Sequence, residues 1–201
     1  MTPSHLTELG LPGIGKVPYG VHMCSFYRSR DELAAALLPY FAAGLRQNER
    51  CVWITARPFS AADARAGLIE AGVDVDAQIE RGALVLRDYG DWYAQAGTLK
   101  GNQVADLWFA EEERALAAGY NGLRITGNTS FVGPLEWEMF MEYEAIVDHA
   151  FRGRRIVTLC TYELNGRGAS EILDVTRRHS CTLDRPDAGW QLLTGWADSP
   201  G

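Results

Sequence analysis

The sequence has no long apolar run, few lysines and few cysteines, and each shortage excludes a class of protein. No apolar run approaches the roughly 18 residues that a membrane span requires, and the most apolar stretch, residues 33–45, contains Pro39. Lysine occurs only as Lys16 and Lys100, there is no basic run, and the net charge is −7. We therefore expect no membrane association and no direct binding to nucleic acid.

The cysteines and the first residues also give no sign of a secreted protein. The beginning of the chain lacks the basic patch and apolar core of a signal peptide. Cysteine occurs at positions 24, 51, 160 and 181, which is too few and too scattered for a disulfide framework. The first three lie in apolar, strand-like runs, where reduced thiols pack as small hydrophobes. We expect a cytoplasmic protein.

A magnesium ligand is missing from the stretch that begins like a nucleotide-binding loop. Residues 10–16 contain Gly, four further residues and Gly-Lys, but the loop pattern continues with a Ser or Thr that ligates magnesium. Val17 and Pro18 stand there instead. A phosphate loop also follows a buried strand, and residues 1–9 show no strand-like apolar run. We expect no nucleotide binding, and we assign residues 1–20 to a Gly/Pro-rich lead-in.

What the sequence does contain is an alternation of strand-like and helix-like segments, which is typical of an α/β protein with a mainly parallel sheet. Its 201 residues suit one domain, which we place at 21–195, with 196–201 as a tail or linker. The expected strands are 21–27, 51–55, 83–87, 123–126 and 156–162, with an edge strand at 190–193. The expected helices are 29–46, 60–72, 102–118, 135–151 and 168–178.

Ligands of open parallel sheets bind beyond the carboxyl ends of the strands. Aromatic and a few polar side chains occupy those ends, which suits a small, partly apolar organic molecule. Arg124 is different because it lies inside an apolar strand, where a buried guanidinium needs a carboxylate or a ligand. The predicted ligand-binding residues at the strand ends are Tyr27, Arg28, Thr55, Arg57, Tyr89, Trp92, Asn128 and Tyr162.

Several stretches together resemble the MEDS family, a methanogen/methylotroph sensory domain also found in dichloromethane-responsive regulators. The resemblance spans about residues 10–183 and implies a three-layer RecA/KaiC-like fold whose phosphate-binding loop has been lost. It also implies a sensor of simple hydrocarbon derivatives. The matching segments are His22-Met23-Cys24, Gly82-Ala83-Leu84, Trp92-Tyr93, Gly119 to Arg124, Glu142-Tyr143-Glu144, Leu159 to Tyr162, and His179.

The KaiC-like strand order implied by the resemblance places the strand of Cys160 beside the strand of His22 and Cys24. His22 and Cys24 are two residues apart, so they face the same side of their strand. The three side chains are candidates for ligand binding, for a soft-metal site or for a thiol-redox pair. The alternative is a buried core in which the imidazole is hydrogen-bonded, because buried cysteine is common.

Other ionisable residues are predicted to have structural roles. We expect the solvated face of one helix to contain Glu138, Glu142 and Glu144. We expect His149 to lie on the surface. We expect His179 to be charged and stabilised by a nearby helix terminus.

The sequence as a whole predicts a non-enzymatic sensory domain that needs no cofactor. It would bind a small organic ligand and signal to a kinase, an anti-sigma factor or a transcription regulator, and a homodimer is left open. The first alternative is a metal or thiol-redox sensor built on His22, Cys24 and Cys160, and the second is a residual NTPase.

Overall fold

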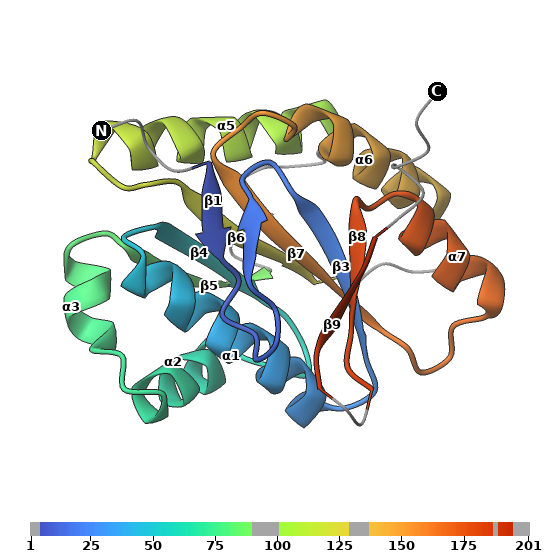
Figure 1. Cartoon of the computed structure of the whole chain (residues 1–201), viewed down its shortest axis with the longest axis horizontal. Helices are drawn as coiled ribbons and strands as arrows, with labels where there is room; N and C mark the ends of the chain where they lie inside the picture. Colours follow the sequence, from blue (N-terminus) through green and yellow to red (C-terminus); the bar gives the residue numbers. More distant parts are fainter. Residues whose placement is uncertain (1–4, 90–100, 129–136, 187–188, 195–201) are drawn as a thin grey trace.

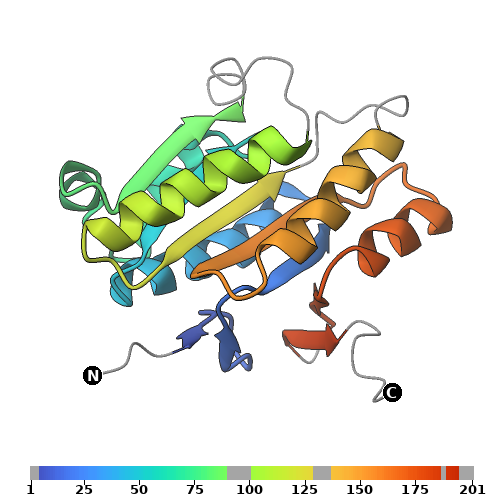
Figure 2. The same ribbon diagram turned by 90° about the horizontal axis from the view of Figure 1, so that it is seen from above.

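A computed structural model of the chain describes residues 5–89, 101–128, 137–186 and 189–194. A seven-stranded sheet with the strand order β5-β4-β6-β7-β3-β8-β9 lies between two layers of helices (Figures 1 and 2). Neighbouring strands of this sheet run parallel, apart from the antiparallel pair β8 and β9. The predicted mainly parallel α/β fold is confirmed.

The strands of the sheet are β3 (His22–Tyr27), β4 (Arg50–Thr55), β5 (Leu84–Asp88), β6 (Leu123–Asn128), β7 (Ile156–Glu163), β8 (Cys181–Asp184) and β9 (Gln191–Thr194). One helical layer is formed by α1 (Arg30–Arg46), α2 (Ala61–Glu70) and α3 (Val75–Glu80). The other is formed by α5 (Gly101–Ala117), α6 (Trp137–Ala150) and α7 (Ala169–Arg177) (Figure 1).

Three elements were not expected from the sequence. Strand β8 is a short buried run without alternation, and α3 is a six-residue helix begun by the N-cap Asp74. The third is a hairpin of β1 (Leu6–Glu8) and β2 (Lys16–Pro18), in which only the middle residue of each strand is buried. Segments this short carry too few apolar positions to show a period.

The hairpin corrects one argument about the stretch that resembles a nucleotide-binding loop. A strand does precede Gly10, but the segment that follows is the turn of a β-hairpin, and Lys16 lies in β2 rather than at a helix. Where the first strand of the large sheet meets a helix, only Arg28 and Ser29 connect β3 to α1. Two residues are too few for a Gly-rich loop that cradles phosphates.

Helix α1 begins at the N-cap Ser29, within the helix expected at 29–46, and its first turn contains the acidic residue Glu32. The Ser29 side chain accepts a hydrogen bond from the backbone N–H of Glu32 at 3.1 Å. The Glu32 carboxylate accepts from the backbone N–H of Arg28 at 2.7 Å, one residue before the position that a capping box would use. The cap therefore fixes the β3–α1 connection as well as the first turn.

Alternation along the strands gives the sheet two different faces. Met23 on β3 and Leu159 on β7 pack in the large core cluster that contains the α1 residues. Cys24 and Cys160, their neighbours along the same strands, pack with Met141 of α6 on the opposite face. The residues of chemical interest on β3 and β7 therefore face the layer of α6 and α7. In the described part of the chain, no helix combines the length and apolarity needed to cross a membrane.

Candidate functional site

Four buried side chains meet between the sheet and α6. His22 of β3, Cys160 of β7, Glu144 of α6 and His179, which follows α7, place one ligand atom each within 4.8 Å of one another. His22 Nε2 lies 3.3 Å from Cys160 Sγ and 3.1 Å from Glu144 Oε2. His179 Nε2 lies 3.3 Å from the same Glu144 oxygen. These residues are called the His/Cys/Glu cluster below.

Strand register and helix periodicity explain how the cluster forms. Strands β3 and β7 pair in parallel with Cys24 opposite Cys160, so His22 lies one step back on the same face. The predicted neighbour relation of these two strands is confirmed. Glu144 lies between Phe140 and Val147 at helical spacing on α6, so its side chain faces the sheet with the apolar residues.

The surroundings of the two imidazoles orient their rings. His179 Nδ1 donates a hydrogen bond to the carbonyl oxygen of Val175 at 2.8 Å. The other ring nitrogen, Nε2, therefore faces the cluster. His22 Nδ1 lies 3.7 Å from Asp148 Oδ1. That carboxylate is in turn held by the Ser180 hydroxyl at 2.8 Å and by Arg152 Nη2 at 2.7 Å.

The four groups interact strongly in their buried setting. Burial opposes charging of His22, but Cys160, Asp148 and Glu144 hold its pKa well above the ordinary value. Burial also opposes ionisation of Glu144, but the two histidines lower its pKa to about 2. Burial and the charge of His22 lower the pKa of His179, and burial raises the pKa of the Cys160 thiol to about 11.

Two atoms of this cluster lack a hydrogen-bond partner among the described residues. Glu144 Oε2 lies within 3.3 Å of both imidazoles but in hydrogen-bond geometry with neither, and His22 Nδ1 is too far from Asp148 to donate. Buried polar atoms are nearly always paired, so such exceptions mark a place where something else is expected to bind.

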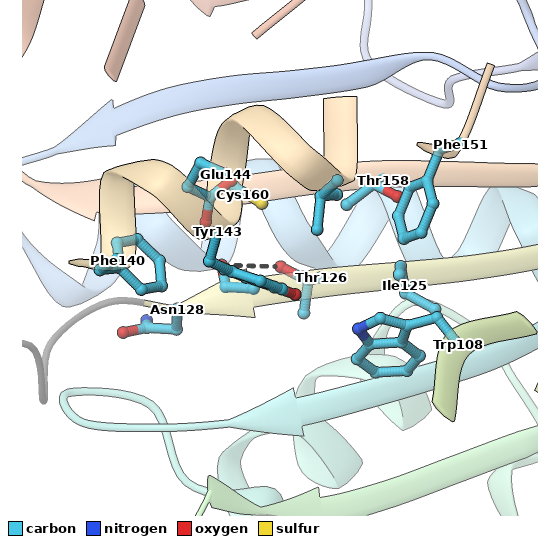
Figure 3. A pocket seen from close by; sticks show the side chains of 12 residues that line it. Trp108, Ile125, Thr126, Asn128, Phe140, Tyr143, Glu144, Phe151, Thr158 and Cys160 are labelled. Carbon is cyan, nitrogen blue, oxygen red and sulfur yellow. Dashed lines mark hydrogen bonds between the residues drawn. The ribbon is translucent and has the colours of Figure 1, made fainter. Parts of the chain in front are cut away.

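A cavity of about 30 Å³ adjoins the cluster between α5, α6, β6 and β7 (Figure 3). Its lining includes Glu144 and Cys160, which lie next to each other in Figure 3. The Thr158 hydroxyl also lines the cavity and has no hydrogen-bond partner among the described residues. The remaining walls are mainly apolar and aromatic, with Trp108, Ile125, Phe140, Tyr143, Val147 and Phe151.

A larger cavity of about 400 Å³ lies between the end of β3 and the β8–β9 hairpin. Three of its four charged side chains, those of Glu32, Asp184 and Arg185, have partners within the chain. Glu32 accepts from the N–H of Arg28, and Asp184 accepts from Gln191 Nε2 at 3.0 Å. Arg185 lies over the Trp190 ring. The smaller cavity, which has unpartnered groups on its wall, is therefore the better candidate site.

The predicted ligand-binding residues are divided among several places. Asn128 and Cys160 line the smaller cavity, and Arg28 lines the larger one. Tyr162 is fully buried with its hydroxyl 3.4 Å from His179 Nε2, and Tyr27 packs in the core cluster on the α1 side of the sheet. Trp92 lies outside the described residues.

The carboxyl ends of β4 and β5 form a separate group. Thr55 donates to Asp88 Oδ1 at 2.7 Å and is buried, whereas Arg57 is exposed. Tyr89 packs on the core cluster that contains Trp108. These three residues do not line either of the two cavities described above.

The buried Arg124 forms an ion pair with a carboxylate, as its position requires. Its Nε donates to Glu49 Oε2 at 2.5 Å, and both side chains are completely buried. Its other four N–H groups donate to the carbonyls of Leu9, Tyr40 and Glu8 and to the hydroxyl of Thr7. All five donors of the guanidinium are used within the chain, on the α1 face of the sheet and away from the cavity.

The three-residue metal set predicted from the sequence differs from the set that the fold assembles. Cys24 Sγ lies 3.2 Å from the Thr182 hydroxyl and does not belong to the His/Cys/Glu cluster. Glu144 was expected on a solvated helix face, but only 2% of it is exposed. His179 was expected to carry a stabilised charge, but it is buried and its pKa is lowered. His149 is exposed as predicted.

Glu144 could have been found from the sequence. An acidic residue within an apolar helical stripe is unusual, because buried carboxylates require a partner. Thr158 and Trp108 gave no comparable signal, because only the packing of distant segments brings them to the cavity.

Comparisons with known proteins agree with this architecture. The chain is similar to a KaiC-like protein of the hyperthermophilic archaeon Pyrococcus horikoshii OT3 with a TM-score of 0.60 and 15% identity, over 97% of this chain and 90% of that one. This likeness confirms the KaiC-like fold. The chain is also 26% identical over 179 residues to the transcriptional repressor DcmR of Methylorubrum extorquens. That match covers 85% of this chain but only 62% of the repressor.

The family assignment rests on a longer continuous match. The sequence profile of the methanogen/methylotroph, DcmR sensory domain matches residues 21–180, which include every strand of the sheet up to β7 and all four residues of the His/Cys/Glu cluster. The chain belongs to the MEDS family of sensory domains.

Proposed function

We propose that the chain is the non-enzymatic sensory domain of a transcription-regulating system and that it binds a small, mainly apolar molecule between α6 and strands β6 and β7. The observation that carries the proposal is the cavity of about 30 Å³, with aromatic walls and the unpartnered Thr158 hydroxyl. A few polar groups in an apolar concavity are typical of small-molecule sites. The similarity to a transcriptional repressor favours a transcription regulator as the output partner.

The size of the cavity limits the ligand. A single water needs about 10–15 Å³ of such space, so about 30 Å³ admits a molecule of two or three non-hydrogen atoms. Tiny ligands gain at most about 1.5 kcal/mol per such atom, which for three atoms corresponds to a Kd near 0.5 mM. One-carbon halides and alcohols have this size and polarity, in agreement with a sensor of simple hydrocarbon derivatives.

Scanning calorimetry with dichloromethane and with methanol tests the proposal. At about 10 mM, a ligand with a Kd near 0.5 mM stabilises the folded state by about 1.8 kcal/mol, which raises Tm by about 4–7 °C in a domain of this size. The expected result is such a rise with at least one of the two compounds.

Gly127→Ala and Gly15→Ala form a matched pair of variants. A Cβ at Gly127 lies 3.1 Å from Cys160 Sγ and narrows the cavity, whereas a Cβ at Gly15 meets nothing within 4 Å. Gly127→Ala should abolish the ligand-dependent rise in Tm and Gly15→Ala should retain it. An equal response of both variants would contradict binding at this cavity.

A further inference from the structure

We propose that His22, Glu144, Cys160 and His179 form a binding site for a zinc-type divalent transition-metal ion. The chemistry of the set fits such an ion, because two imidazoles, a thiolate and a carboxylate are the nitrogen, sulfur and oxygen ligands that zinc takes in proteins. All four side chains are buried, and each comes from a different segment of the chain. The proposal rests on this geometry and does not require a small molecule in the adjoining cavity, which Glu144 and Cys160 also line.

Three of the separations between the ligand atoms are close to those of a tetrahedral site. With metal–ligand bonds of about 2.0–2.3 Å, tetrahedral ligand atoms lie roughly 3.3–3.7 Å apart. Three of the six separations are 3.1 Å from His22 Nε2 to Glu144 Oε2, 3.3 Å from His22 Nε2 to Cys160 Sγ, and 3.3 Å from His179 Nε2 to Glu144 Oε2. All four ligand atoms lie within 4.8 Å of one another, so an ion at the centre requires the more distant ligands to move inward.

The unpartnered oxygen is a second, independent observation. Glu144 Oε2 points at both imidazole Nε2 atoms without a hydrogen bond. The Nδ1–H of His179 donates a hydrogen bond to the Val175 carbonyl. In the neutral ring, Nε2 therefore carries a lone pair that faces the Glu144 carboxylate. Two acceptors facing each other repel, and a bound cation turns that repulsion into attraction.

Groups outside the cluster have the positions that support metal-bound histidines. A metal-bound histidine usually has its other ring nitrogen directed at a carbonyl or a carboxylate. The Val175 carbonyl has this relation to His179, and Asp148, 3.7 Å away and fixed by Ser180 and Arg152, has it to His22. The charges also balance, because a divalent cation neutralises the Cys160 thiolate and the Glu144 carboxylate.

A thiol-redox site on Cys24 and Cys160 is less well supported. A reactive cysteine is partly exposed, so that an oxidant or a partner thiol can reach it. Both thiols are free and buried. A metal ion, in contrast, binds a buried thiolate directly and is not hindered by poor access of an oxidant.

Titration of the metal-free full chain with Co²⁺ tests the site, because tetrahedral Co²⁺ absorbs visible light and a cobalt-bound thiolate adds a near-ultraviolet charge-transfer band. The expected result is one Co²⁺ per chain with both features, displaced by Zn²⁺. No binding, or binding without the thiolate band, would overturn the proposal. The wild-type spectrum decides this even if a variant fails to fold.

Variants separate the proposed ligands from their neighbours. Cys160→Ser should remove the thiolate band, whereas Cys24→Ala, which removes a buried thiol on the adjacent strand, should retain it. Asp148→Asn keeps all four ligands and should weaken Co²⁺ binding by about 10- to 100-fold, as loss of a supporting group usually does. A band that survives Cys160→Ser but disappears in Cys24→Ala would assign the ion to the other cysteine and overturn the site. If Co²⁺ does not bind, the proposed binding of dichloromethane or methanol is still decided separately, by the calorimetric experiment.

Discussion

Two buried polar clusters lie on opposite faces of the same sheet, and they differ in how completely their atoms are paired. On the α1 face, every N–H of Arg124 donates to an acceptor, and Glu49 accepts from Arg124, Thr7 and Tyr19. On the α6 face, the His/Cys/Glu cluster leaves Glu144 Oε2 and His22 Nδ1 without hydrogen bonds. A saturated network has no capacity for a ligand, whereas an unsaturated one next to a cavity does. The comparison assigns stability to the first cluster and binding to the second.

The largest expected effect is on the Arg124 side. Glu49→Gln keeps the shape of the side chain but leaves the guanidinium buried without its counter-charge, so it should lower the free energy of unfolding by about 3–5 kcal/mol. Urea unfolding of the variant and the wild type measures this difference.

Asp76→Asn is the matched control at an exposed ion pair. Arg65 Nη2 lies 2.7 Å from Asp76 Oδ1, but the Asp76 side chain is 81% exposed. Its loss should change stability by less than about 1 kcal/mol. Equal losses of unfolding free energy in Glu49→Gln and Asp76→Asn would contradict the claim that the buried ion pair stabilises the fold more than the exposed one.

A smaller effect distinguishes two threonines on neighbouring strands. Thr126 donates to the carbonyl of Leu159 at 2.6 Å, whereas the Thr158 hydroxyl has no partner among the described residues. Thr126→Val should cost about 1 kcal/mol or more, because it leaves that carbonyl short of a donor. Thr158→Val should be close to neutral for stability but should weaken the response to dichloromethane or methanol. A larger stability loss for Thr158→Val would contradict the description of its hydroxyl as available to a ligand.

The smallest expected effect is none at all. Lys16 is an exposed residue of β2, and only two residues connect β3 to α1. Calorimetric titration of wild type and Lys16→Ala with Mg-ATP should therefore give the same flat trace. Binding by wild type that Lys16→Ala abolishes would restore a nucleotide function for this loop.

The fold could be predicted further than the site. Continuous apolar runs such as residues 156–162 carry their own strand signal, and their order along the chain is sufficient for a parallel α/β sheet. The hairpin of β1 and β2 has only one buried residue per strand, so tertiary pairing rather than pattern determines it.

The site depends on contacts between segments far apart in the sequence. His22 and Cys160 could be brought together through strand neighbours, but Cys24, the third member of the predicted set, bonds to Thr182 of a strand that was not predicted. Glu144 and His179 complete the cluster because α6 and the end of α7 pack over β3 and β7. For Arg124, the sequence predicted that a buried guanidinium needs a carboxylate or a ligand. It did not predict that the carboxylate is that of Glu49.

The most direct test of the account is a methyl NMR titration of isotope-labelled protein with dichloromethane and with methanol. Ile125 and Val147 line the small cavity, whereas Leu9 and Leu45 pack on the α1 side of the sheet, where Arg124 and Glu49 lie. We expect the methyl signals of Ile125 and Val147 to shift in a saturable way, with a Kd on the order of 1 mM, while those of Leu9 and Leu45 stay in place. Saturable shifts at Leu9 and Leu45, or none at Ile125 and Val147 with either compound, would contradict the assignment of binding to the α6 face.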